Sequence, residues 1–352
     1  MLDSLYTEAV RKKGLITDIF NELEDKDSII FKMWNDEIIF KSNEDFPIAA
    51  GDGSFNKKKF LSFYFFAVAA ESLIFDKTLK KLESVEINTL DYHRFSEDLL
   101  RNYMGLFEVK NALKVLNQFD LLYYLYDGSI LGDLIRPFPT GTDLSKKLKS
   151  EVIENCLEEL NSKINKLTVD ISSDALIDRY YKIYPNKFEI NIFLTNIEKL
   201  LVLKKLLKYN KKLIAISKTS TSNELFNSNI PDIAIFDKYT KSEGYSKPIY
   251  KDLSKEVKHV FEIEDEFFKS LKFTIFYLRL EENKNVLKVE LPYIASEEDI
   301  IQIISRLKRY STEGYPYLLK KAHKDVVIST KDIDHLGNIV NIYEKSGREM
   351  LD

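Results

Sequence analysis

Two short segments place an aspartate, a glycine and a serine directly after apolar stretches. Asp52–Ser54 follows the stretch 47–51, and Asp127–Ser129 follows the stretch 121–126. An aspartate at the end of a buried strand is unfavourable unless its charge is compensated. The glycine permits a tight turn or the close approach of a ligand. One such segment is more often an ordinary turn, but two of them after two apolar strands favour a functional site.

Two aspartates that meet in a fold repel each other, and a divalent cation between them removes the repulsion. Oxygen ligands select hard ions, so Mg²⁺ or Mn²⁺ is the expected ion. Glu108 is a third candidate ligand, because it is the only acidic residue between Asp98 and Asp120 and lies on the predicted helix before the second aspartate. An ordinary exposed helix glutamate is the alternative.

Two basic residues are further candidates. Lys218 follows the predicted strand 213–217, where an ammonium group can stabilise a phosphate or a developing oxyanion. His323 ends the segment 314–323. The alternatives are a solvated strand end for the lysine and a structural role for the histidine.

Several familiar catalytic signatures are absent from the sequence. It contains no Gly-x-x-x-x-Gly-Lys-Ser/Thr loop and no Gly-x-Gly-x-x-Gly segment, so ATPase and dinucleotide chemistry have no support. It also lacks His-Glu-x-x-His and Gly-x-Ser-x-Gly. Cys156 is the single cysteine, which excludes an intrachain disulfide and a cysteine-based zinc cluster.

Hydrophobic periodicity predicts strands that alternate with helices, which is typical of an α/β fold with a mixed sheet. We expect the first strand to end at Asp52 with a turn at Gly53, and the apolar run 60–70 to be an interior strand. Other strands are expected at 121–126, 213–217 and, as a hairpin, at 273–280 and 286–291. Helices are expected at 98–119, 144–167, 190–209, 296–310 and 333–343, and the fourth begins with the capping pattern Ser296-Glu297-Glu298-Asp299.

The 352 residues show no repeat, low-complexity tract or long linker, so a single domain is expected over 1–352. Residues 1–44 are expected to form a mainly helical extension, 45–330 the core and 331–352 a C-terminal helix. The highly charged stretch 143–189 is expected to be an insertion or lid outside the core.

The composition, 44% apolar and 31% charged, is that of a globular protein. The formal net charge of −4, taken alone, argues against a nucleic-acid partner. The longest largely apolar stretch, 61–70, is about half of the ~20 residues that a membrane helix needs. The first residues lack the pattern of a signal peptide, so we expect a soluble cytoplasmic protein that does not enter a membrane.

Together, the motifs resemble the NurA nuclease family over about residues 50–323. The resemblance implies an RNase H-like core, a homodimer, and Mn²⁺-dependent DNA hydrolysis with Mg²⁺ as the alternative ion. It implies 5′-to-3′ exonuclease activity on single- and double-stranded DNA and single-strand endonuclease activity in DNA end resection at the nucleoid. The implied partners are the hexameric HerA translocase and the break-repair nuclease–ATPase complex. The segments that carry the resemblance are Asp52–Ser54, Glu108, Asp127–Ser129, Ser217–Lys218, Val289–Pro292, Gly314–Pro316 and Ala322–His323.

The resemblance also implies roles for individual residues. Asp52, Glu108 and Asp127 match the acidic metal ligands, and Lys218 matches a basic residue near them. Tyr315 and His323 match the late tyrosine and histidine of the site. We expect the histidine to complete the shell of one or two ions or to move a proton, and the tyrosine to order a phosphate or stack on a base.

One position departs from the family pattern. Many members carry an arginine two residues before the glutamate of the Glu-x-Pro segment, where this chain has Lys288. Because a lysine lacks the planar fork of an arginine, a bidentate contact from this position is not expected.

A DNA path needs local positive charge, and lysines lie beside the acidic segments. The alternative for any lysine run is a solvated surface. The candidates for backbone contacts are Lys57, Lys58, Lys59, Lys218, Lys320 and Lys321.

Two other functions fit parts of the pattern. A catalytically silent DNA-binding or adaptor subunit of a translocase would share the fold without needing buried acids. Glycoside hydrolysis by paired carboxylates would need no metal. The apolar faces within 1–44 and 330–352 are expected to serve dimerisation or partner docking.

Overall fold

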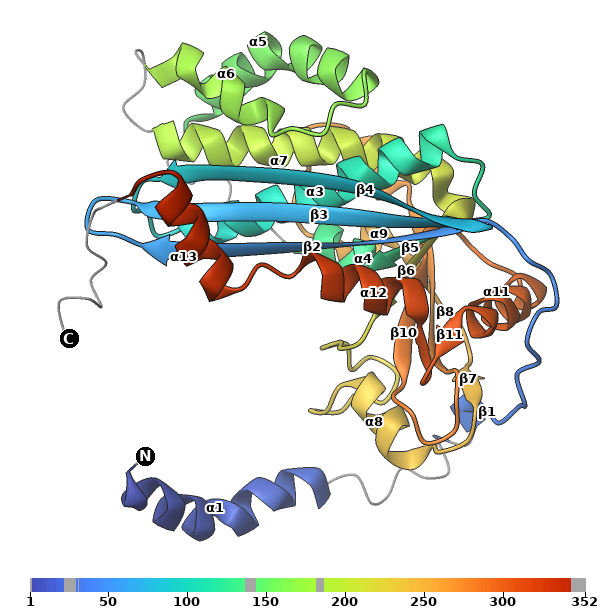
Figure 1. The fold of residues 1–352 in the computed structure, drawn as a ribbon. Helices are drawn as coiled ribbons and strands as arrows, with labels where there is room; N and C mark the ends of the chain where they lie inside the picture. The colour runs from blue at the N-terminus through green and yellow to red at the C-terminus, as the bar shows by residue number, and fades with distance from the viewer. Residues whose placement is uncertain (1, 22–29, 31, 137–143, 182–186, 343–352) are drawn as a thin grey trace.

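A ten-stranded mixed sheet forms the centre of the molecule in the computed structural model, which describes residues 2–21, 30, 32–136, 144–181 and 187–342. The strand order is β1-β7-β9-β10-β6-β5-β2-β3-β4, and β8 pairs with β9 (Figure 1). The bounds of these strands are β1 Trp34–Asn35, β2 Ile48–Lys59, β3 Tyr64–Asp76, β4 Thr78–Leu90, β5 Tyr123–Asp127, β6 Leu213–Ser217, β7 Gly244–Ser246, β8 Ile249–Asp252, β9 Lys272–Arg279 and β10 Leu287–Leu291.

Helices cover both faces of this sheet. The short strands β11 (Ser311–Thr312) and β12 (Tyr315–Pro316) pair with each other outside it. The helices are α1 Asp3–Asn21, α3 Ser96–Gln118, α4 Ile130–Ile135, α5 Lys146–Asn165, α6 Ser172–Tyr181, α7 Lys187–Leu206, α8 Asp232–Tyr239, α9 Leu253–Glu256, α10 Asp265–Lys269, α11 Glu297–Arg309, α12 Tyr317–Val326 and α13 Thr330–Ile339, with a 3₁₀ turn at Leu207–Lys212.

The expected α/β class with a mixed sheet is confirmed, and most predicted elements are present. The long helix, the later hairpin and the capped helix lie at α3, β9–β10 and α11. Ser296 and Asp299 bond each other's backbone N–H groups as the capping pattern predicted. These elements were predictable because their apolar periodicity and end signals agree with their tertiary surroundings.

The expected strand end at Asp52 was wrong. β2 runs on from Ile48 to Lys59, paired antiparallel along its length with β3, so Asp52 lies within the strand. Gly53 therefore serves a close approach rather than a turn. The apolar run expected as a strand at 60–70 is shifted, because the chain turns between Lys59 and Tyr64 and β3 then continues to Asp76. The strand β4, at the edge of the sheet, was not predicted, because most of its side chains are exposed and it lacks a continuous apolar run.

The stretch 143–189 is not a lid outside the core. Its helices α5 and α6 lie on α7 (Figure 1). Four residues of α5, Val152, Cys156, Leu160 and Ile164, are buried in the same apolar cluster as α3, α7 and the adjoining sheet face. The charges that suggested an insertion lie on the outer side of these helices.

The N-terminal segment is helical over α1, which lies apart from the sheet in Figure 1. Large apolar side chains remain exposed on it, including Leu5, Val10 and Leu15. Apart from β1, the only regular secondary structure in residues 32–44 is a short piece of helix at 32–33. Part of the expected C-terminal helix is present as α13, whose Ile333 packs on Phe60, Phe65 and Ala67, and residues 343–352 of that expectation lie outside the described residues. None of the described helices has the length and apolar character to cross a membrane.

Candidate active site

Asp52 and Asp127 come from adjacent parallel strands. The register of β2 and β5 pairs Ala50 with Leu125 and Gly51 with Tyr126. The two aspartates are the next residues on these strands, so they lie side by side at one level of the sheet. Side chains of neighbouring strands at one level share a face. The sheet therefore brings together the two carboxylates that the paired Asp-Gly-Ser segments predicted.

His323 reaches this pair from α12, which lies along β2 (Figure 1). Its Nδ1 lies 2.6 Å from Oδ2 of Asp52. When Asp52 is ionised, Nδ1 donates to it, and Nε2 is left with its lone pair. One ligand atom from each of Asp52, Asp127 and His323 lies within 4.8 Å of the others.

This donor set fits a divalent cation. Asp52 is only 9% exposed, and burial is the largest cause that raises the pKa of Asp127. Two carboxylates this close and this shielded need a positive partner. The two carboxylates suit Mn²⁺ or Mg²⁺, which take hard oxygen ligands, and the imidazole nitrogen fits the transition metal Mn²⁺ better than Mg²⁺. Asp52, Asp127 and His323 are therefore the residues that would hold an ion.

Lys218 places a positive charge of the protein itself beside the two aspartates. It follows β6, and its Nζ lies 2.8 Å from Oδ2 of Asp127. The same ammonium group lies 5.0 Å from the centre of the Tyr315 ring. The lysine thus joins the acidic pair to the tyrosine that was expected beside it.

Tyr315 has a buried hydroxyl group with no hydrogen-bond partner among the described residues. Burial, followed by the charges of Asp127 and Asp52, raises its pKa far above the ordinary value. The group therefore stays protonated. The hydroxyl lies near enough to Asp127 for that carboxylate to act on it, and, with no hydrogen bond of good geometry formed, it can donate to Asp127 or to a bound anion.

Glu108 approaches from the opposite face of the sheet. It lies on α3 against Gly53, where a Cβ atom would overlap its Oε1 atom and the Met104 side chain. Tyr126 donates to its carboxylate at 3.3 Å. Its oxygens are not part of the group formed by Asp52, Asp127 and His323. Glu108 is therefore beside the site, and its role as a metal ligand stays a prediction.

Burial raises the pKa of Glu108 to about 8, and the charge of Asp52 is the next cause. In the metal-free protein its carboxyl group is therefore neutral near pH 7. A cation placed beside Asp52 would act in the opposite direction, because positive charge favours the ionised form.

The lysines predicted to contact DNA are mostly engaged in ion pairs. Lys57 pairs with Glu97, Lys58 with Asp334, Lys320 with Glu313 and Lys321 with Asp325. Lys59 lies 5.1 Å from the centre of the Tyr92 ring. Exposed ion pairs are weak enough to be exchanged for a phosphate, so their contact with DNA stays a prediction.

Sequence reasoning missed the residues that hold α12 in place. Ser54 accepts a hydrogen bond from the Ile328 backbone N–H at 3.1 Å, just beyond the end of the helix. Lys81 on β4 bridges the buried Glu71 of β3 at 2.9 Å and Asp325 of α12 at 3.3 Å. These contacts join strands and a helix far apart in sequence, so spacing gave no signal for them.

Lys199 was not among the residues proposed for the site. It lies on α7, and its Nζ is 3.3 Å from Asp133. Its charge acts to lower the pKa of Glu108, against the effect of burial. A lysine among leucines on a packed helix was the one available signal.

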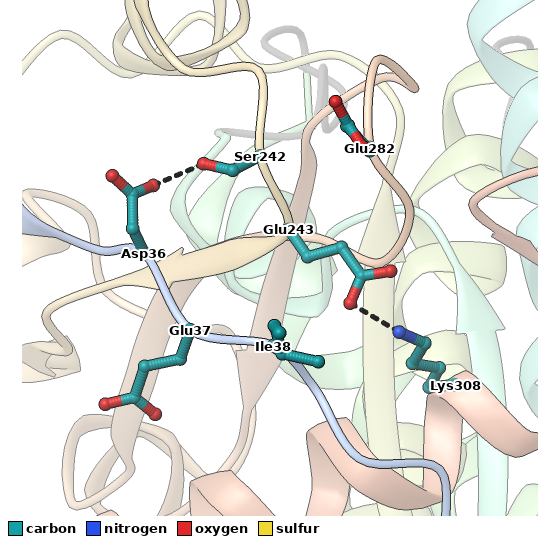
Figure 2. Close-up of a pocket in the computed structure, with 7 residues that line it drawn as sticks. All are labelled: Asp36, Glu37, Ile38, Ser242, Glu243, Glu282 and Lys308. Atoms are coloured by element: carbon teal, nitrogen blue, oxygen red, sulfur yellow. Dashed lines mark hydrogen bonds and ion pairs between the residues drawn. The ribbon is translucent and has the colours of Figure 1, made fainter.

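A pocket of about 330 Å³ lies elsewhere on the molecule (Figure 2). Its acidic side chains are Asp36, Glu37, Glu243 and Glu282, and Glu243 pairs with Lys308. It shares no residue with the aspartate–histidine site. The candidate site is therefore marked by its charge arrangement rather than by this concavity.

Comparison with known proteins covers the same residues. The chain matches the NurA domain over residues 46–328, which includes both aspartates, Glu108 and His323. The chain belongs to the NurA family.

Individual NurA proteins match over most of their length. A relative from Methanocaldococcus jannaschii, named a probable DNA double-strand break repair nuclease NurA, is 33% identical over 330 residues, which are 89% of this chain and 82% of the relative. The crystal structure of the NurA nuclease from Sulfolobus solfataricus gives a TM-score of 0.75 at 25% identity and covers 97% of this chain and 96% of that one. A NurA structure bound to dAMP and manganese gives a TM-score of 0.73 at 17% identity, covers 99% and 100%, and shares the fold.

The raised pKa of Glu108 predicts a pH dependence of stability. The folded metal-free protein keeps this proton up to about pH 8, whereas the unfolded chain loses it near the ordinary value of 4.5. The free energy of unfolding should therefore fall as the pH rises between these values. Glu108→Gln should remove the fall and exceed the wild type at pH 9 by up to about 5 kcal/mol, at about 1.4 kcal/mol for each of the roughly 3.5 pKa units between the two values.

Urea unfolding in EDTA from pH 4 to pH 9 measures this effect. Glu154→Gln, an exposed change on α5, is the control and should follow the wild-type curve. A Glu108→Gln curve parallel to the wild type would show that Glu108 ionises normally.

Gly53→Ala should push Glu108 away from Asp52. The added methyl group overlaps the carboxylate and Met104, and such overpacking costs about 1–3 kcal/mol. The penalty, measured by urea unfolding, should shrink in a Glu108→Ala background. Gly14→Ala in α1 meets no atom within 4 Å and is the matched control, expected to be neutral or slightly stabilising. Equal effects of the two alanines would contradict the close approach.

Proposed function

We propose that this NurA protein is a metal-dependent DNA nuclease that works at Asp52, Asp127 and His323. The observation that carries the proposal is the convergence of their ligand atoms within 4.8 Å from β2, β5 and α12. The names of the NurA relatives, which describe DNA double-strand break repair nucleases, support it. The shared fold with a NurA protein bound to dAMP and manganese supports the choice of Mn²⁺, with Mg²⁺ as the alternative.

The residues around the acids suit hydrolysis of a phosphodiester. A bound ion would lower the pKa of water and offset charge on the phosphate. Lys218 can exchange its contact with Asp127 for a phosphate oxygen, and the unpartnered Tyr315 hydroxyl can donate to another. His323 has a side chain that is 59% exposed and an Nδ1 atom engaged by Asp52, so its Nε2 atom is left for one of two roles: to complete the shell of the ion, or to accept and return a proton.

Glu108 is proposed as a further ligand once an ion is present. It borders Gly53, the residue after Asp52, and the charge of that aspartate already acts on it. Its neutral form in the metal-free protein means that ligation would release a proton. We propose one or two ions at this site.

We propose an RNase H-like core for this chemistry. The antiparallel strands β4, β3 and β2 are followed by β5 and β6, which run parallel to β2. Asp52 lies on β2, the middle one of these five strands, and Asp127 ends the parallel neighbour β5. One sheet thereby carries both acids at one level.

The finer activities follow from the family resemblance. We propose 5′-to-3′ exonuclease activity on single- and double-stranded DNA, with single-strand endonuclease activity, in end resection at the nucleoid of the cytoplasm. We propose a homodimer that works with the HerA translocase and with the break-repair nuclease–ATPase complex. Lys57, Lys58, Lys59, Lys218, Lys320 and Lys321 are the proposed contacts to the DNA backbone.

Asp52→Asn and Asp127→Asn should each lower Mn²⁺-dependent cleavage by at least about 100-fold. Changing a residue that only supports a metal ligand typically costs about 10- to 100-fold, and changing a ligand itself should cost more. The assay is degradation of labelled single- and double-stranded DNA with Mn²⁺ or EDTA. Asp120→Asn, an exposed residue paired with Lys212, is the control and should retain activity. DNA binding without cleavage by the wild type would favour the adaptor interpretation.

Deletion of residues 1–20 should weaken dimerisation or HerA binding, because α1 exposes apolar side chains that the rest of the described chain does not cover. Light scattering measures the mass, and pull-down with HerA measures the binding. Val10→Ser with Leu15→Ser tests the apolar face, and Lys12→Ser with Lys13→Ser is the matched control. Unchanged mass and binding after deletion would remove α1 from both interfaces.

A further inference from the structure

Glu290 on β10 is a fully buried carboxylate that the reaction chemistry does not use. It accepts hydrogen bonds from the Ser129 hydroxyl at 2.6 Å and from the Leu131 backbone N–H at 3.1 Å. Lys288 pairs with it at 2.8 Å. A buried carboxylate is tolerated only where such partners satisfy it, so this residue is fixed firmly in its place.

The carboxylate reaches its partners across an intervening strand. Glu290 lies opposite Ala215 of β6, and Ala215 lies opposite Tyr126 of β5. These three residues share one level and therefore one face of the sheet, the face opposite to that of Asp127. The small side chain of Ala215 leaves room for Glu290 to extend over β6 toward the turn after Asp127.

That turn is held from two sides. The Gly128 N–H donates to the Ile216 carbonyl oxygen at 2.9 Å, and its φ of +123° is a conformation that favours glycine. Ser129 accepts from the Gly132 N–H at 2.8 Å while donating to Glu290. The backbone of β6 and the carboxylate of β10 together set where β5 ends.

We propose that Glu290 is a positioning residue for Asp127. Charged acceptors form the stronger hydrogen bonds, so the Glu290–Ser129 contact fixes the turn and, through it, the direction of the Asp127 carboxylate. This direction decides whether Asp127 meets Asp52 and His323 as one set of ligands. Lys288 serves the same purpose indirectly, because it compensates the buried charge. The proposal rests on the proposed metal-dependent function.

Two measurements on Glu290→Gln test the proposal. In metal-free protein, amide hydrogen exchange of residues 127–132 should be at least about 10-fold faster than in the wild type. Mn²⁺ titration, followed by the electron paramagnetic resonance of the free ion, should show about 10-fold weaker binding. Cleavage should need correspondingly more Mn²⁺ and approach the wild-type rate at saturation.

Two further variants separate positioning from general stability. Ser129→Ala removes one of the same hydrogen bonds from a half-buried turn and should shift exchange and Mn²⁺ affinity in the same direction. Asp232→Asn is the matched control, a buried carboxylate on α8 that accepts from the Leu225 and Phe226 N–H groups in a separate apolar cluster. It should lower the melting temperature without changing exchange at 127–132 or Mn²⁺ affinity.

The outcomes distinguish the positioning role of Glu290 from the proposed metal-dependent function. Unchanged exchange at 127–132 in both Glu290→Gln and Ser129→Ala overturns the positioning role. Unchanged Mn²⁺ affinity in both variants, while the wild type binds, also overturns it. If Glu290→Gln does not fold, Ser129→Ala decides. Wild-type protein that neither binds Mn²⁺ nor cleaves DNA refutes the proposed function, and the exchange data then still decide whether Glu290 fixes the turn.

Discussion

The repulsion between two shielded carboxylates on neighbouring strands is the constraint on which the site depends. Asp52 and Asp127 lie at one level of a sheet, on one face, with little access to water. Such an arrangement is unfavourable without positive charge. Lys218 supplies part of that charge and His323 contributes a hydrogen bond, each from a separate element and within hydrogen-bond distance of one aspartate. The end of β6, which Lys218 follows, and α12, which carries His323, are therefore held close to the two aspartates.

The sheet divides the surrounding residues between its two faces. α12 brings His323 to the face of the aspartates, where Ser54 and the Glu71–Lys81–Asp325 bridge hold the helix. α3 brings Glu108 to the other face, and Gly53 lets its carboxyl group approach. Alternation of side chains along β2 explains why adjacent residues serve opposite faces. A carboxyl group kept neutral by burial can thus lie close to one that is ionised.

Net charge proved a poor guide to a nucleic-acid partner. The value of −4 averages over the whole chain, whereas phosphate contacts depend on local charge. The lysines near the acidic segments are themselves paired with acids, as Lys57 is with Glu97 and Lys321 with Asp325. DNA bound there would replace one set of anions by another, so the net change in charge contacts is small. Binding at these lysines would then depend on geometry, and its dependence on salt would be weaker than for the same number of unpaired lysines.

The sequence by itself determined the elements and the chemical types of the site. Apolar periodicity and the Ser296 capping pattern predicted α3, α11 and the β9–β10 hairpin, because local preference and burial agree there. The paired Asp-Gly-Ser segments and His323 identified the residues that the structure brings together. Their types could be read because a buried acid after an apolar run conflicts with its surroundings and therefore signals a purpose.

Only the tertiary structure decided how far β2 extends, which face each residue takes and what holds the site. β2 passes through Asp52 because the next strand, β3, pairs with it along its whole length, whereas the Asp-Gly-Ser segment taken locally is typical of a turn. The buried carboxylate of Glu290 acts on Ser129 across β6, at a separation of 161 residues. The charged stretch 143–189 joined the core because α7 offers its helices an apolar face. Contacts of this kind arise from packing between distant segments, and no spacing within one segment encodes them.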